Sequence, residues 1–329
     1  MMSFGQKYGL KSRPMYTIKR HCRGNILTAV SCVLLMNGFV AQGYAAEPTA
    51  LPVEEHAESK QELPLAATYA NWIFSGSVSN ESGDTYEYFF QAKRKQDHVH
   101  AMVSLVDAQT KTVIFMQNAE VQLTEPQIDN WVIGDIFLRY NTINRSWIFG
   151  IKKSNQIGFN FKVDTINQLE HAPKIQKVRQ GVTMSVVQTG QVNGHIQLEE
   201  NTPAQFVTGK NAWFREIVMQ KPSTKVPVMQ GLLCRFDDGS GLYSMRMGDK
   251  PFWHSTFSGS YDPEGVAAAV SKSIHVEQLK AGLWRVKVPY PKLQFDLSDV
   301  LQDQALVLGF VDKKQKSGFC VISKEDGLA

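Results

Sequence analysis

The chain has 329 residues, of which 43% are hydrophobic and 20% are charged. This length and composition fit two globular domains of ordinary size and exclude an intrinsically disordered chain. The formal charge is +4, but the first 46 residues hold six Lys or Arg and no Asp or Glu. The remainder therefore carries a formal charge of −2, which offers no broad attraction for nucleic acid phosphates.

The N-terminus has the order of a secretory signal. Cationic residues precede an apolar run at residues 26–40, and small residues follow at Gly43, Ala45 and Ala46. This order predicts a signal peptide over residues 1–45, with cleavage after Ala46 as a close second. Met15 offers an alternative start, and an uncleaved membrane anchor is the alternative role. We expect an exported protein, periplasmic or secreted, with a position at the membrane periphery as a further option.

Residues 46–68 are rich in Pro and Glu without a sustained apolar period, which is typical of a flexible tether. From Tyr69 the pattern changes. Apolar residues alternate between Trp72 and Val78, and a turn at residues 80–84 leads into a β-prone run at 85–92. Two such runs around a short Gly-containing loop predict a hairpin. Further strand-like runs lie at residues 98–106, 112–116, 135–140, 146–152, 156–163 and 181–187.

The second half repeats this style, with one exception. Residues 264–279 form a modest helix candidate. Strands are predicted at residues 191–198, 212–219, 230–236, 241–247, 252–261, 283–288, 293–296, 305–311 and 319–323. Many short strands separated by turn residues predict an all-β sandwich or barrel. We place the first domain at residues 69–190 and the second at 191–329.

Several short motifs, in order along the chain, carry a family resemblance. They are the opening Trp72-x-Phe74-x-Gly76, the Asp97–Ala101 run, Val207-Thr208-Gly209 before Trp213, and the Phe236–Arg246 hairpin. Their order and spacing resemble the lipocalin-like AttH/CrtC family, which includes carotenoid 1,2-hydratases. The resemblance covers Tyr69 to the C-terminus. It implies two lipocalin-like antiparallel β-barrels in tandem, with an apolar-lined cavity.

The departures from the family pattern concern acidic residues. Where the family has Asp and Glu after the crossover Trp, this chain has Arg215 and Ile217. Near the C-terminus, Leu308 and Val321 stand where the family often has Glu. Hydration of a double bond needs a general acid to protonate a carbon, and a carboxylic acid in an apolar site is the expected group. The resemblance therefore implies a pocket lined by these apolar residues, and a weakened case for a hydratase.

Seven residues are candidate ligand-binding residues. They lie at the junction, in the hairpin and on one early strand: Trp213, Arg215, Glu216, Tyr243, Arg246, His98 and His100. Neighbours on a strand point to opposite faces, so Arg215 and Glu216 are expected to face different ways. His98 and His100 share a face, which suits metal ligation but equally suits two solvent-facing histidines. No third ligand stands at a convincing spacing, so no metal site is predicted.

Cys234 and Cys320 are the cysteines that remain after the predicted leader. In an exported protein such a pair indicates a disulfide, with two buried thiols as the alternative.

Three functions are compatible with these observations. The first is an exported protein that binds a hydrophobic or amphipathic small molecule of lipid or isoprenoid type. The second is an enzyme, a hydratase, isomerase or cyclase, acting without a cofactor on an apolar isoprenoid substrate. The third is a structural envelope protein whose barrel is filled by side chains. The loss of the acidic residues of the family pattern favours the first, non-catalytic function, and the sequence also has no phosphate-binding loop, catalytic Ser motif or paired catalytic carboxylates.

Overall fold

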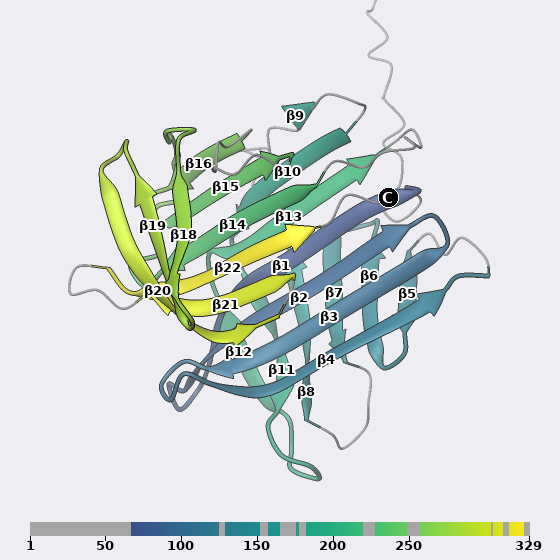
Figure 1. Ribbon diagram of the computed structural model, residues 1–329. Helices are drawn as coiled ribbons and strands as arrows, with labels where there is room; N and C mark the ends of the chain where they lie inside the picture. The colour runs from purple at the N-terminus through teal and green to yellow at the C-terminus, as the bar shows by residue number, and fades with distance from the viewer. Residues whose placement is uncertain are drawn as a thin grey trace, which may run out of the picture. The chain divides into compact units, whose positions relative to one another are not determined.

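The computed structural model describes residues 67–124, 129–151, 157–164, 176–177, 182–219, 228–248, 257–303, 305–311 and 316–325. All of these belong to one compact unit, residues 58–329. They form two antiparallel β-sheets, and no helix occurs among them (Figure 1). The predicted signal peptide and almost all of the predicted tether lie outside the described residues.

In the part of the chain that is described, no helix is long and apolar enough to cross a membrane.

The first sheet has thirteen strands within the described ranges. Ten follow one path, in the order β4-β3-β2-β1-β12-β11-β8-β7-β6-β5, and β13, β10 and β9 branch from β1. Their bounds are β1 (Tyr69–Asn80), β2 (Thr85–Lys95), β3 (His98–Asp107), β4 (Thr112–Gln122), β5 (Asn130–Ile133), β6 (Ile136–Asn141), β7 (Ser146–Ile151), β8 (Gly158–Asp164), β9 (Gln176–Lys177), β10 (Val182–Thr189), β11 (Val192–Gln197), β12 (Gln205–Gly209) and β13 (Ala212–Met219).

Strand β1 is the centre of this sheet. Along one side it pairs with β2 over almost its whole length. Along the other side its first part, Tyr69–Ser75, pairs with β13, and its end pairs with β12. The predicted domain boundary between residues 190 and 191 falls between β10 and β11, inside this sheet. The first sheet continues to Met219 because β11, β12 and β13 return to β8, β1 and β10.

The second sheet has nine strands in the described residues, in the order β17-β16-β15-β14-β22-β21-β20-β19-β18. Their bounds are β14 (Met229–Phe236), β15 (Gly241–Met247), β16 (Phe257–Tyr261), β17 (Ala267–Ala269), β18 (His275–Lys280), β19 (Leu283–Val288), β20 (Leu293–Gln302), β21 (Leu306–Val311) and β22 (Gly318–Glu325).

The helix predicted at residues 264–279 is wrong. This segment contains β17, which pairs with β16, and β18, which pairs with β19. Between them, Val270 and Ile274 are buried. Cross-strand hydrogen bonds and the burial of these two side chains outweigh a weak helical period, since propensity is easily overridden by tertiary packing.

Aromatic side chains fill the inside of the first sheet. On β1, Trp72 and Phe74 point inward, as their two-residue spacing requires. Phe74 stacks on Phe149 with ring centroids 4.3 Å apart and on Phe214 at 4.9 Å. Other buried members of this cluster are Tyr88, Phe90, Trp131, Trp147, Phe159 and Phe161. The interior is a packed core at these positions.

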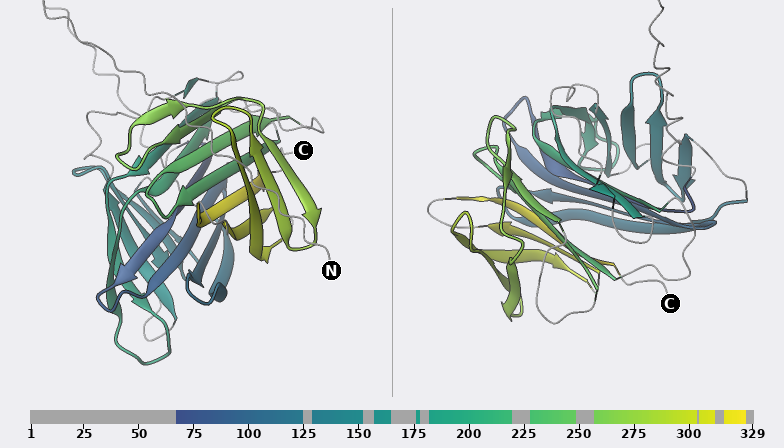
Figure 2. Two further views of the ribbon diagram at one scale, coloured as in Figure 1. Left: turned by 90° about the vertical axis from the view of Figure 1, so that its left-hand side faces the viewer. Right: turned by 90° about the horizontal axis from the view of Figure 1, so that it is seen from above.

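A second core lies between the two sheets, and we call it the seam. The first sheet contributes Ile73, Phe89, Met102, Val106 and Trp213, and the second sheet contributes Leu233, Leu306, Leu308, Phe310, Phe319 and Val321. Figure 2 shows the two sheets as separate layers. Strands β1 and β2 are therefore buried on both faces over most of their length, and each carries consecutive apolar residues, such as Trp72 and Ile73 on β1 and Phe89 and Phe90 on β2.

The second sheet encloses a smaller interior of its own. Leu232, Phe236, Val286, Phe295 and Ile322 belong to this cluster. The prediction of an all-β chain with two lipocalin-like antiparallel sheets in tandem is confirmed. Each sheet curls around its own core, and the pair is joined along the seam.

Candidate functional site

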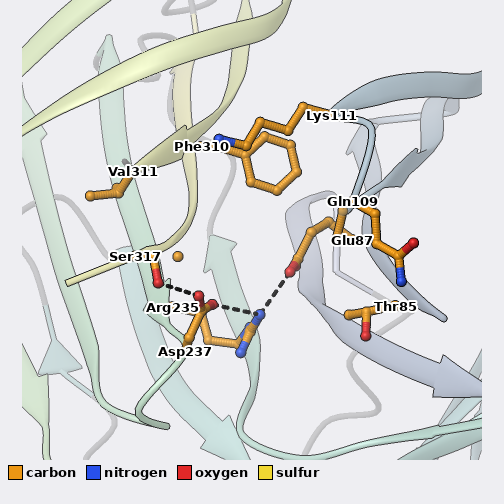
Figure 3. A pocket seen from close by; sticks show the side chains of 11 residues that line it. Thr85, Glu87, Gln109, Lys111, Arg235, Asp237, Phe310, Val311 and Ser317 are labelled. Atoms are coloured by element: carbon orange, nitrogen blue, oxygen red, sulfur yellow. Dashed lines mark hydrogen bonds and ion pairs between the residues drawn. The ribbon is translucent and has the colours of Figure 1, made fainter. Parts of the chain in front are cut away.

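A pocket of about 310 Å³ opens at one end of the seam, and we call it the seam pocket. Residues from both sheets line it: Thr85, Glu87, Ala108, Gln109, Lys111, Arg235, Asp237, Phe310, Val311, Ser317 and Gly318. Figure 3 shows Glu87 and Gln109 on one side, Val311 and Ser317 on the other, and Arg235 reaching toward Glu87. The pocket therefore exists only where the two sheets meet.

An ion pair between the sheets forms the polar part of this pocket. Nη2 of Arg235 donates to Oε1 of Glu87 at 2.7 Å, and their side chains are only 12% and 4% exposed. Glu87 lies two residues before Phe89 on β2, so both side chains are on the face that meets the second sheet. Arg235 lies two residues after Leu233 on β14, so both side chains are on the face that meets the first sheet. Strand alternation thus directs both charges into the seam.

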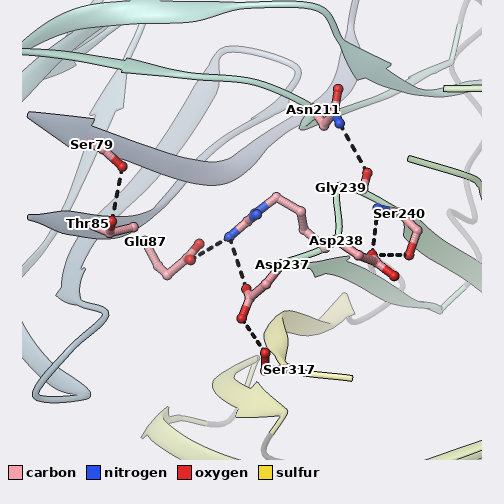
Figure 4. Close-up of polar contacts among 10 residues, drawn as sticks. Ser79, Thr85, Glu87, Asn211, Asp237, Asp238, Gly239, Ser240 and Ser317 are labelled. Atoms are coloured by element: carbon pink, nitrogen blue, oxygen red, sulfur yellow. Dashed lines mark hydrogen bonds and ion pairs between the residues drawn. The ribbon is translucent and has the colours of Figure 1, made fainter. Parts of the chain in front are cut away.

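A second carboxylate lies near the same guanidinium. Asp237 Oδ1 is 3.9 Å from Arg235 Nη2, and the Ser317 hydroxyl donates to Asp237 Oδ2 (Figure 4). Burial raises the pKa of the Glu87 carboxyl, and the charge of Arg235 opposes this rise. Burial therefore favours the protonated form of this carboxyl, and the Arg235 charge favours the ionised form.

The pair is not fully satisfied by the protein. Within the described residues, Oε2 of Glu87 and Nε of Arg235 are buried and make no hydrogen bond. Each such atom costs about 1–3 kcal/mol unless water or a ligand completes it. Phe310, Val311 and Ala108 supply an apolar wall beside these atoms, and the Lys111 ammonium lies 5.7 Å from the centre of the Phe310 ring. The seam pocket can therefore receive a small molecule with one apolar and one polar side.

A second pocket, of about 330 Å³, lies on the inner face of the second sheet, and we call it the second-sheet pocket. Arg246 of the predicted hairpin lines it, together with Trp284 and residues of β14, β18 and β20 to β22. Of the seven predicted site residues, Arg246 is the one that lines a pocket described here.

Trp213 and Tyr243 meet across the seam. Their ring centroids are 5.8 Å apart, and Tyr261 lies 5.7 Å from Trp213. The Tyr261 hydroxyl donates to the carbonyl oxygen of Val186 on β10 at 3.3 Å. These aromatic residues join β13 and β10 of the first sheet to β15 and β16 of the second, which is a packing role.

Arg215 and Glu216 point to opposite faces of β13, as strand alternation predicts. Arg215 is 1% exposed in the seam region and donates to the Ser323 hydroxyl at 3.0 Å. Glu216 faces the aromatic interior, where Nε1 of Trp72 donates to it at 2.9 Å. Burial raises the pKa of Glu216, and the hydrogen bond from Trp72 opposes this rise. The two residues belong to different environments and do not form one site.

The two predicted histidines lie near the edge of the first sheet. His98 is exposed, 3.8 Å from Asp97 and 3.7 Å from Glu120. His100 is partly buried, which lowers its pKa. Across the described ranges, no three His, Cys, Asp or Glu side chains are grouped closely enough to hold a metal ion.

Ile217, Leu308 and Val321, which the resemblance places in an apolar pocket, lie in packed clusters of side chains. Leu308 and Val321 are packed in the seam, and Ile217 is packed among Met184, Met229 and other residues of a smaller cluster. None of the three lines either described pocket. These three side chains are buried because the other sheet covers the outer face of their strands.

Sequence reasoning missed Glu87 and Arg235. A weak signal was present, since Glu87 stands between Tyr86 and Tyr88, and Arg235 between Cys234 and Phe236. A charge inside an apolar strand is expected to point to solvent when one face is buried. Here both faces of β2 and both faces of β14 are covered, so Glu87 and Arg235 must each have a partner within the protein.

Cys234 and Cys320 form a disulfide bond between β14 and β22. The two residues stand directly opposite each other in the strand register. The bond lies in the core of the second sheet, beside Leu232 and Phe236.

Comparison with known proteins finds similarity in structure only. No protein-family model matches the sequence, and no curated protein matches it. A crystal structure of an AttH-type protein from Nitrosomonas europaea aligns with a TM-score of 0.54 and 11% identity, covering 78% of this chain and 92% of that one. Kievitone hydratase from Nectria haematococca aligns with a TM-score of 0.58 and 10% identity, covering 80% and 90%. The resemblance to AttH-type proteins is thus confirmed at the level of the fold, which this chain shares over most of its length with both structures.

Proposed function

We propose that this protein binds a small amphipathic molecule in the seam pocket. The observation that carries the proposal is the Glu87–Arg235 pair, which is buried at an apolar wall yet leaves one oxygen and one nitrogen without a hydrogen bond. Ligand sites combine an apolar lining with a few polar groups that fix orientation. The volume of about 310 Å³ is at the small end of such sites.

The chemistry of the pocket defines the ligand class. A hydroxyl or amide can accept from the Arg235 guanidinium and donate to the Glu87 carboxylate, while an apolar body packs on Phe310 and Val311. A neutral molecule fits better than an ion, because Arg235 is already balanced by Glu87 and approached by Asp237. We propose that this binding takes place in the periplasm or outside the cell, because the sequence predicts a secretory leader.

Retinol tests this function, because it is a neutral apolar molecule with one hydroxyl. We expect the mature chain to bind retinol, with a rise in retinol fluorescence. The variant Ala108→Trp fills the seam pocket and should abolish binding, whereas Ala268→Trp, at an exposed position on β17, should bind like the parent. No binding by the parent, or equal binding by folded Ala108→Trp, would contradict the proposal.

Catalysis by Glu87 is the second candidate function. It is favoured by the raised pKa of this buried acid and by the fold shared with a hydratase. In such a reaction the Glu87 carboxylic acid would protonate one carbon of a double bond, water would add to the cation, and the added water would return a proton to the carboxylate.

The two candidates are separated by assaying an acyclic carotenoid. For a binding protein we expect no hydrated product by mass spectrometry. Formation of a product one water heavier, lost in Glu87→Gln, would establish the catalytic function instead. The variant Glu216→Gln, which changes a partly buried acid on the opposite face of the first sheet, serves as the control.

A further inference from the structure

The second-sheet pocket has features that the seam pocket lacks. It lies on the inner face of the second sheet, where strands far apart in the sheet order come together around one space: Arg246 on β15 and Trp284 on β19 both line it. Val307 and Ile322 also line it, and both belong to the core cluster of this sheet. The pocket therefore borders the apolar core of the second sheet.

One of the residues that line this pocket, Trp284, carries an unsatisfied hydrogen-bond donor. The indole Nε1 of Trp284 is buried and makes no hydrogen bond within the described residues. The ring itself packs against the core cluster together with Val276. Because a buried N–H group without a partner is unfavourable, a ligand with an acceptor atom would be stabilised at this position.

The charges around the pocket favour an anion. Arg246 and Lys324, each of which also has a partner within the protein, contribute two positive charges, and Asp303 contributes one negative charge, so the described lining residues carry a net charge of +1. Guanidinium and ammonium groups are donors only, and the Trp284 indole is also only a donor. The lining thus combines an excess of positive charge with an extra hydrogen-bond donor.

We propose that the second-sheet pocket binds a single-chain amphiphile with an anionic head group, at a site separate from the seam pocket. The head group lies near Arg246 and Trp284, and the hydrocarbon chain lies along Val307 and Ile322. A charge-assisted hydrogen bond to Arg246 provides the affinity for the head group. Burial of the hydrocarbon chain provides the rest of the binding free energy.

Dodecanoate, measured by calorimetric titration of the full mature chain, tests the proposal. We expect dodecanoate to bind, and dodecanol and dodecyltrimethylammonium to bind at least about tenfold more weakly, because they lack the negative charge. Arg246→Gln and Trp284→Phe should each weaken dodecanoate binding, the former by about tenfold or more. Arg285→Gln is the matched control, since Arg285 is the next residue on β19 and pairs with Asp296 outside the pocket.

The seam variant distinguishes this site from the one proposed above. Ala108→Trp should leave dodecanoate binding unchanged while it abolishes retinol binding. Equal affinity for the three probes, or unchanged dodecanoate binding in folded Arg246→Gln and Trp284→Phe, would overturn the proposal. So would loss of dodecanoate binding in folded Ala108→Trp, because the anion would then occupy the seam pocket.

Discussion

Glu87 and Glu216 show two ways in which this fold accommodates a carboxyl group away from solvent. Glu87 has a cationic partner in the other sheet, whereas Glu216 accepts a hydrogen bond from the Trp72 indole. Burial raises the pKa of both groups, but only Glu87 has a nearby cation opposing the rise. The two residues should therefore respond differently to substitution.

Removal of Arg235 should be more damaging than removal of the whole pair. In Arg235→Met the buried Glu87 carboxylate loses its partner, and we expect a loss of about 3–5 kcal/mol in the free energy of unfolding. The double variant Glu87→Gln, Arg235→Met should recover most of this loss, because no buried charge remains. Urea denaturation of the parent, both single variants and the double variant measures the coupling. Additive losses would show that the ion pair is not a coupled unit.

Glu216→Gln should stabilise the protein in a pH-dependent way. A carboxyl whose pKa is raised on folding binds its proton more tightly in the folded state, so its contribution is fully present below the unfolded-state pKa and is lost as pH rises through the folded-state pKa. Gln keeps the acceptor for Trp72 and carries no charge. The variant should match the parent at pH 4 and exceed it in unfolding free energy at pH 8. Exposed Glu199→Gln is the control, and an equal difference at both pH values would contradict this account.

At the scale of elements, β13 and β14 meet where the long Arg215 side chain lies against Gly231, which has no side chain. Arg215 extends from β13 toward Gly231 on β14, and a Cβ at Gly231 would lie 2.3 Å from Nη1 of Arg215 and 2.9 Å from Oγ of Ser323. The guanidinium is buried and bonded to Ser323, so it has little room to move. The contact between the two sheets thus depends on glycine at this position.

Gly231→Ala should lower the unfolding free energy by about 1–3 kcal/mol, because the added methyl displaces Arg215 from its hydrogen bond. Gly190→Ala is the matched control, since a Cβ there would have no neighbour within 4 Å. Thermal or urea denaturation of the two variants measures the difference. Equal stability of both would show that the seam adapts without strain.

The disulfide between β14 and β22 should stabilise the second sheet. The two cysteines are 86 residues apart, and the loss of chain entropy in the unfolded state corresponds to about 4–5 kcal/mol for a loop of this length, often less in practice. Reduction should therefore lower the midpoint of urea denaturation. Thiol titration under denaturing, non-reducing conditions should detect neither cysteine, and two free thiols in protein from an oxidising compartment would refute the bond.

At the scale of the whole molecule, the seam makes the two sheets one body. Each sheet has an inner face around its own core and an outer face that meets the other sheet. The aromatic filling of the first sheet leaves the seam pocket and the second-sheet pocket as the described places for small molecules. Binding is therefore expected to depend on both sheets, and truncation of either should abolish it.

The mature chain is expected to begin near Ala46. Positive charges followed by an apolar run and small residues form the signal that is cleaved on export. N-terminal sequencing of protein recovered from an exporting host determines the site. An intact N-terminus on membrane-bound protein would indicate an anchor in place of a signal peptide.

The sequence by itself determined the fold class and the positions of most strands along the chain. Alternation of apolar residues and turn residues at regular spacing predicted β1, β2 and most later strands, and the opposite orientations of Arg215 and Glu216. It did not predict β5, which is only four residues long, or β18, whose mostly exposed residues lack an alternating pattern. Local patterns identify strands with one buried face more readily than short or exposed strands.

The tertiary structure alone decided the sites. Glu87 and Arg235 are 148 residues apart in the chain, and nothing in either local pattern indicates that they meet. The same holds for Leu308 and Val321, which pack in the seam because the first sheet covers their outer face. Strand alternation specifies which residues share a face. The meeting of two sheets determines which faces are buried and which charges must pair.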